Sequence, residues 1–130
     1  MKNGKEKRLK AQNLSAGDWD RIYFRAEELM QSHKFGCSES LMLAFQETLG
    51  EGILPPEAVA MASAFRGGMG GAGCVCGALA AAQMVLGVFF GYYGAALYEP
   101  DAEAAKKLRA LSLELHDDFR LANGSTCFRT

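Results

Sequence analysis

An uncharged stretch, residues 67–98, constrains the fold of this 130-residue chain more than any other feature. Its part 74–93, "CVCGALAAAQMVLGVFFGYY", is apolar on every side if it forms a helix. A helix that is hydrophobic all round is buried, either at the centre of a bundle or in a membrane. Nine glycines in the stretch, and Gln83 in its apolar part, favour the bundle. We therefore predict that residues 74–93 form a buried central helix, with membrane association as the alternative.

Amphipathic segments on either side of this stretch supply the partners that a central helix needs. Their apolar residues recur at spacings of three and four, which is typical of helices with one buried face. We expect Asp18 to be the first N-cap, and Gly50 and the "NG" at 123–124 to end two of the helices. No alternating strand pattern occurs in the sequence. The expected helices cover residues 18–33, 37–49, 56–65, 74–93 and 100–122.

These elements predict an all-α fold with one domain, a bundle of about five helices. Residues 1–17 are expected to be a flexible N-terminal tail and residues 18–130 the helical domain. The chain is long enough to bury a core without covalent cross-links. Its net charge of −1 gives no electrostatic footprint for nucleic acid. The basic run 1–10 lacks the apolar region of a secretory signal, so we expect a cytoplasmic protein.

Four cysteines are the main chemical feature: Cys37, Cys74, Cys76 and Cys127. Without an export signal, such a set indicates metal binding or redox activity rather than structural disulfides. Cys37, Cys74 and Cys76 lie at predicted helix starts, where unpaired amides and the helix dipole favour a thiolate. A glycine-rich loop precedes Cys74, and we expect it to expose N–H groups and to let backbone approach the sulfurs. The candidate cofactor-binding glycines are Gly68, Gly70, Gly71 and Gly73.

Each cysteine has a simpler interpretation as a small buried hydrophobe. Residues two apart on a helix point to nearly opposite faces. Cys74 and Cys76 therefore share one ligand only if Cys74 lies in the loop. His33, four residues before Cys37, is a candidate to tune its thiolate or complete a metal site, although a surface position is the general expectation.

Two further polar residues are weaker candidates. Arg66 precedes the glycine loop and either faces an anionic ligand or is solvated, because nothing near it in sequence carries charge. His116 has Asp117 and Asp118 beside it, but consecutive residues on a helix do not face one another. We therefore predict that His116 is a surface residue.

Three stretches carry a family pattern in order: "FGCSESLMLAF", "AFRGGMGGAGCVCGALAAAQMVLG" and "NGSTCFR". They resemble the C_GCAxxG_C_C family, small helical proteins that are taken to be redox-active and are named for their cysteines. The resemblance implies that Cys37, Cys76 and Cys127 are the family's thiols. Ala81 replaces the last glycine of the motif. The further cysteine expected near Cys127 is missing, so either Cys74 is the fourth sulfur or the set is incomplete.

The family is also similar to part of a split-Soret type cytochrome for which an iron–sulfur centre has been proposed. An iron–sulfur cluster is therefore a candidate cofactor. Zinc is a second candidate, because four thiolates suit either group. The chain has no C-x-x-C-H sequence, so covalently attached haem is not expected.

Three functions compete. In the first, a thiol–disulfide oxidoreductase, Cys37 and Cys76 exchange disulfides with a redox partner or small molecule, which needs Cα atoms within about 7 Å. In the second, Cys37, Cys74, Cys76 and Cys127 hold an iron–sulfur cluster or zinc. In the third, the chain is a helical interaction or membrane-associated protein whose cysteines only pack. An alanine- and glycine-rich face on residues 74–93 is compatible with a homodimer.

Overall fold

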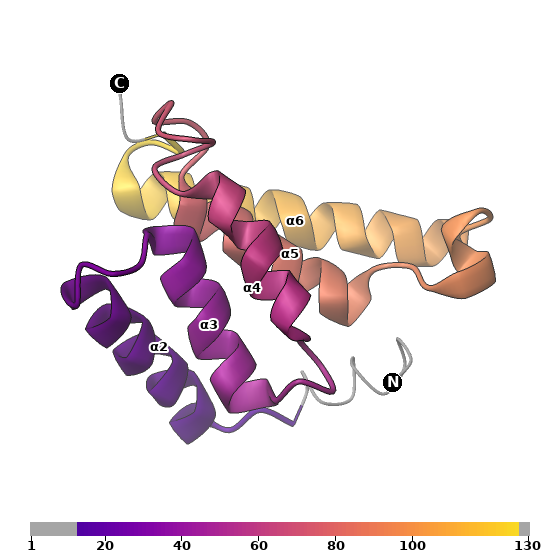
Figure 1. Ribbon diagram of the computed structural model, residues 1–130. Helices are drawn as coiled ribbons and strands as arrows, with labels where there is room; N and C mark the ends of the chain where they lie inside the picture. Colours follow the sequence, from indigo (N-terminus) through magenta and orange to yellow (C-terminus); the bar gives the residue numbers. More distant parts are fainter. Residues whose placement is uncertain (1–12, 128–130) are drawn as a thin grey trace.

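The computed structural model describes residues 13–127, in which all regular structure is helical (Figure 1). The predicted all-α fold is confirmed. Most of the predicted flexible tail, residues 1–12, lies outside the described residues. The elements are α2 (Ala16–Gln31), α3 (Cys37–Leu49), α4 (Pro56–Ala62), η1 (Ser63–Phe65), α5 (Gly77–Phe90), η2 (Gly94–Leu97) and α6 (Ala102–Asn123).

Helix α2 begins earlier than its sequence predicted. The N-cap is Ser15, whose hydroxyl accepts a hydrogen bond from the Asp18 N–H at 3.1 Å. The Asp18 carboxylate accepts in return from the Ser15 N–H at 2.9 Å. The prediction of Asp18 as the N-cap is therefore wrong, because Asp18 is the third helical residue of a capping box that Ser15 opens.

Helix α3 occupies the middle of the bundle and packs against α2, α4 and α5. The helix begins at Cys37 as predicted, with Gly36 as its N-cap, and the Gly36 N–H donates to the Glu39 carboxylate at 3.1 Å. Gly50, with a φ of +88°, ends the helix as predicted. Arg25 of α2 donates to Glu47 of α3 at 2.7 Å and ties the two helices at the surface. The buried residues of α3 are Ser38, Ser40, Met42, Ala44, Phe45 and Leu49.

Helix α5 is the apolar helix expected from the uncharged stretch. All 14 of its residues are described, and each is buried or half-buried. It contacts α3, α4 and α6. The helix begins at Gly77, three residues later than predicted, because Cys76 is the N-cap and Cys74 stays in the preceding loop. Within the described residues, no helix has both the length and the apolar character needed to cross a membrane.

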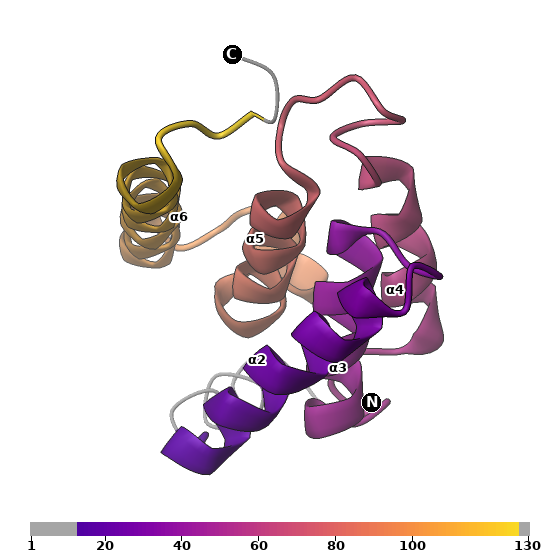
Figure 2. The same cartoon turned by 90° about the vertical axis from the view of Figure 1, so that its left-hand side faces the viewer.

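Helix α6 lies on one side of α5, with α2, α3 and α4 on the other (Figure 2). Gln83 of α5 and Ser112 of α6 form a reciprocal pair. The Gln83 amide donates to the Ser112 carbonyl at 2.9 Å, and the Ser112 hydroxyl donates to the Gln83 side-chain oxygen at 2.8 Å. Gly124, with a φ of +80°, ends α6 and confirms the predicted stop. The chain then turns back toward the start of α5.

Candidate functional site: the cysteine end of the bundle

The start of α5 meets the segment after α6 at one end of the molecule. The glycine-rich loop and the end of the described chain lie together there (Figure 1). One backbone hydrogen bond joins the segments, from the Cys76 N–H to the Thr126 carbonyl at 2.7 Å. That N–H belongs to a helix N-cap residue, and the bond brings Cys127 beside the start of α5.

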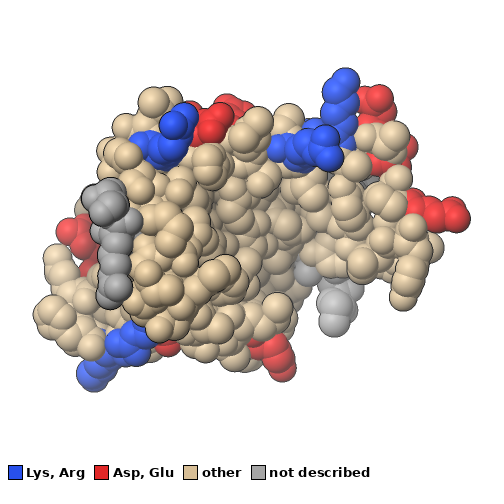
Figure 3. Space-filling model, turned by 90° about the horizontal axis from the view of Figure 1, so that it is seen from above, with Lys and Arg blue, Asp and Glu red and all other residues tan. Residues whose placement is uncertain are grey.

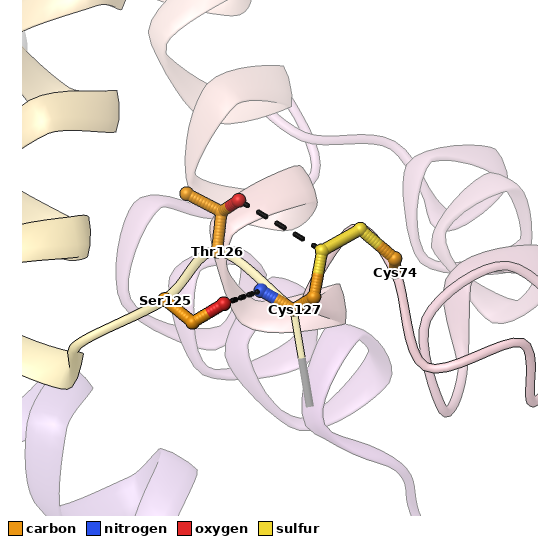
Figure 4. Close-up of a disulfide and its surroundings, with 4 residues drawn as sticks. All are labelled: Cys74, Ser125, Thr126 and Cys127. Carbon is orange, nitrogen blue, oxygen red and sulfur yellow. Dashed lines mark hydrogen bonds between the residues drawn. A yellow bond between two sulfur atoms is a disulfide. The ribbon is translucent and has the colours of Figure 1, made fainter. Parts of the chain in front are cut away.

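A disulfide joins Cys74 to Cys127, 53 residues apart in sequence, with Cα atoms 4.3 Å apart (Figure 4). The Ser125 hydroxyl accepts from the Cys127 N–H at 3.0 Å. This turn was not predicted from the sequence. Its sequence signal is Ser125, because a serine hydroxyl often accepts a hydrogen bond from the backbone N–H two residues later. Cys74 is exposed. Its interpretation as a small buried hydrophobe is therefore wrong.

The sequence favoured Cys37 with Cys76, and the structure bonds a different pair. Cys37 and Cys76 are free thiols. Because α5 begins only at Gly77, Cys74 lies in the loop and faces the segment after α6, where Cys127 lies. The exchange between Cys37 and Cys76 stays a prediction.

The two free thiols line different hollows, Cys76 a cavity that it shares with Cys127 and Cys37 a cleft between α2 and α3. Cys76 is 6% exposed and lines a cavity of about 280 Å³ together with Cys127 and Asn123. Cys37 is half-buried against Gly77, where a Cβ atom would lie 2.7 Å from the Cys37 sulfur. The disulfide joins Cys74 to Cys127, and Cys76 shares a cavity with Cys127, whereas Cys37 does not line that cavity.

The glycine-rich loop folds on itself. The amides of four glycines donate at 2.9 to 3.2 Å to carbonyl oxygens within residues 64–68; these are Gly68, Gly70, Gly71 and Gly73. The expectation of free amides near the sulfurs is therefore wrong, and a cofactor-binding role for these glycines stays a prediction that cannot rest on those N–H groups. The close approach of backbone does occur. A Cβ at Gly68, whose φ is +72°, would lie 2.6 Å from the Cys74 nitrogen.

Comparison with known proteins matches residues 35–130 to the family described as "Putative redox-active protein (C_GCAxxG_C_C)". The chain belongs to this family. The match covers all four cysteines and every element from α3 onward. Comparisons with curated proteins and with solved structures gave no match. The description attaches redox activity to the family and names no substrate or cofactor.

A metal site in this C_GCAxxG_C_C protein would need several converging thiolates. Among residues 13–127, no group of three or more histidine, cysteine, aspartate or glutamate side chains is placed to hold a metal ion. Two of the four sulfurs are bonded to each other. The arrangement therefore does not fit an iron–sulfur cluster or a zinc site formed by Cys37, Cys74, Cys76 and Cys127.

The other polar candidates have local partners. The Arg66 guanidinium lies 3.7 Å from the Glu39 carboxylate, so a charge is near it in space although none is near in sequence. His116 Nδ1 lies 3.0 Å from an Asp117 carboxylate oxygen. The expectation that these consecutive residues do not face one another is therefore wrong for this pair, although both side chains are partly exposed at the surface of α6, as predicted for His116. His33 is exposed in the turn after α2.

The charged side chains that the structure describes at this end of the molecule do not form a patch of one sign that would favour an anionic or a cationic ligand. On the face seen in Figure 3, acidic and basic side chains lie around the margin and the centre is uncharged. The chemistry of the site is therefore that of its sulfurs rather than of an electrostatic patch.

Proposed function

We propose that this protein carries out thiol–disulfide exchange and that the Cys74–Cys127 disulfide is its redox-active bond. The observation that carries the proposal is the hydrogen bond from the Cys76 N–H to the Thr126 carbonyl. It puts a free thiol in the same cavity as one sulfur of a disulfide. Thiolate attack on a disulfide sulfur is the elementary step of all such exchange.

Within the chain, the Cys76 thiolate attacks the Cys127 sulfur. A Cys76–Cys127 bond forms, and Cys74 leaves as a thiolate that takes up the proton lost by Cys76. The number of disulfides is unchanged, so the step needs no external oxidant. Because Cys76 is buried and Cys74 is exposed, the exchange converts a sheltered thiol into one that a partner can reach.

A reduced partner protein with two thiols drives the second reaction. One partner thiol attacks the exposed Cys74 sulfur, and Cys127 leaves as a thiolate and is protonated. The partner's second thiol then displaces Cys74, so that the partner is oxidised and Cys74 and Cys127 are both reduced. Cys76 and Cys127, two of the three thiols that the resemblance implies, thus act together with Cys74 in this scheme. The exchange between Cys37 and Cys76 that the sequence favoured is not part of it.

The test is a redox titration of the full chain in dithiothreitol buffers, with acid trapping, alkylation and mass mapping of the linked peptides. We expect the Cys74–Cys127 bond to open at a potential above about −300 mV, since exposed disulfides are more oxidising than structural ones. A fraction of wild-type chains should carry a Cys76–Cys127 link, and Cys76→Ser should lack it.

Thr48→Ser, at the far end of α3 from the cysteines, is the matched handling control and should retain both links. A Cys74–Cys127 bond that never exchanges with Cys76, and that stays closed until the protein unfolds, would show that the disulfide is structural.

A further inference from the structure

Cys37 lies in the wall of a cleft that the disulfide does not line. This α2–α3 cleft has a volume of about 380 Å³ and is formed by one face of α2, the first turns of α3 and Ala78 of α5. Cys76 and Cys127 line a separate cavity. The volume lies within the range of small-molecule sites.

Ser40 gives the cleft an unused polar group. It is three residues after Cys37, so both side chains lie on one face of α3. Ser40 lines the cleft and is 1% exposed, and its hydroxyl has no hydrogen-bond partner among the described residues. Burying a hydroxyl without a hydrogen-bond partner costs folding free energy. A ligand group that hydrogen-bonds to it recovers that free energy on binding.

The other residues of the cleft wall favour a cationic ligand over an anionic one. Met30 and Leu41 contribute apolar surface, and Glu27 contributes the only carboxylate that the described part of the chain places there. The wall includes no lysine, arginine or histidine among the described residues. An anionic ligand would therefore meet a like charge, whereas a cationic one would meet Glu27.

From these observations, we infer that Cys37 forms a mixed disulfide with a small aminothiol held in the α2–α3 cleft. The alkyl chain lies along Met30 and Leu41, and the protonated amine donates to Ser40 or Glu27. The Cys37 thiolate attacks one sulfur of the aminothiol's symmetrical disulfide. A Cys37–S–S–R bond forms, and the second aminothiol leaves as a thiolate that takes up the Cys37 proton. The inference rests on the proposed exchange chemistry but not on the Cys74–Cys127 bond.

The test measures adduct formation at Cys37 by mass mapping after treatment with three disulfides. These are cystamine (cationic), 2-hydroxyethyl disulfide (neutral) and 3,3′-dithiodipropionate (anionic). A free peptide with the sequence of residues 34–42 provides the intrinsic reactivity of each reagent. After this correction, we expect cystamine to modify Cys37 about fivefold faster than dithiodipropionate.

Two matched pairs of variants locate the effect. Ser40→Ala should lower the equilibrium yield of the cystamine adduct about fivefold. Ser38→Ala removes another buried, unpartnered hydroxyl that is not in the cleft wall, and should leave the yield unchanged. Glu27→Gln should abolish the preference for cystamine, and Asp20→Asn, elsewhere on α2, should keep it.

Equal corrected rates for the three reagents, or equal effects of Ser38→Ala and Ser40→Ala, would overturn the inference. The same measurements on a Cys74→Ser/Cys127→Ser chain separate the two proposals. Selectivity at Cys37 that persists there supports the cleft whatever the fate of the disulfide proposal. Loss of selectivity in that chain alone would show that the cleft depends on the disulfide and would also overturn the inference.

Discussion

Helices α3 and α6 are both amphipathic, but the fold uses them differently. Six of the 13 residues of α3 are buried, whereas none of the 22 residues of α6, all of them described, is buried. Helix α3 contacts three other helices, and α6 contacts α5 along one side (Figure 2). The apolar residues of α6 are therefore half-covered at most.

The difference shows two ways of holding a helix. Burial of apolar surface holds α3, and it acts along the whole length of that helix. Separate attachments hold α6: the Cys74–Cys127 disulfide, the Cys76–Thr126 hydrogen bond and the Gln83–Ser112 pair. The strongest of these attachments is the one that a reductant can open. The following experiments test whether α6 is held by attachments rather than by burial.

The largest effect should come from removing the disulfide. The bond closes a loop of 53 residues, and the chain-entropy model gives it about 4 kcal/mol of stabilisation. We expect the Cys74→Ser/Cys127→Ser chain to lose about that free energy of unfolding in urea, and its amides in α6 to exchange faster than those in α3. Reductant should have no further effect on this double variant. Equal acceleration of exchange in α3 and α6 would contradict the comparison.

Truncation of apolar side chains should then distinguish the two helices. Met42 of α3 is 1% exposed, and Met42→Ala should cost about 3 kcal/mol because a cavity remains in a tightly packed core. Leu111 of α6 is half-buried, and Leu111→Ala should cost less than about 1 kcal/mol. Urea unfolding of both variants measures the difference. Similar costs would mean that burial holds α6 after all.

A third experiment addresses the junction of α3 with α5. A Cβ at Gly77 would lie 2.7 Å from both the Cys37 sulfur and the Phe65 carbonyl oxygen. Gly77→Ala should therefore cost about 2 kcal/mol through overpacking. Gly87, in the same helix, has open space around its Cβ position, and Gly87→Ala should be neutral or stabilising by up to about 1 kcal/mol. Thermal unfolding compares the two, and equal shifts would exclude the close packing of Cys37 on α5.

The smallest effect should come from the Gln83–Ser112 pair. Ser112→Ala leaves the Gln83 oxygen without its donor and should cost about 1 kcal/mol. We expect amide exchange to accelerate in the middle of α6 only. Ser63→Ala removes a local hydroxyl bond to the Ala60 carbonyl and should leave α6 exchange unchanged. Unchanged amide exchange in α6 of the Ser112→Ala chain would mean that α6 is held only by the contacts at the cysteine end.

The sequence was informative where local chemistry decides the structure. The uncharged run predicted a covered α5, and Gly50 and Gly124 predicted two helix ends, because glycine at a positive φ is a local requirement. The start of α5 was predicted three residues early. Its N-cap is Cys76, and the Cys76 N–H is bonded to Thr126, a residue 50 positions away that periodicity cannot reveal.

The candidate site shows the same limit. Sequence identified all four cysteines and the loop that brings backbone near Cys74. It could not identify which sulfurs pair, because the Cys74–Cys127 pairing depends on where α6 returns to the bundle. It also gave no sign of the α2–α3 cleft, since Ser40 resembles any serine on a helix until its burial and its missing partner are known.

The Cys74–Cys127 bond also fixes the topology of the molecule. It makes residues 74–127 a covalent ring that contains α5, η2 and α6. The exposed residues of η2 lie within that ring. A protease that cuts once there opens the ring but leaves a single covalently connected molecule, and the two fragments separate only when the disulfide is reduced. One cleavage site can thus report the oxidation state of the protein on a gel.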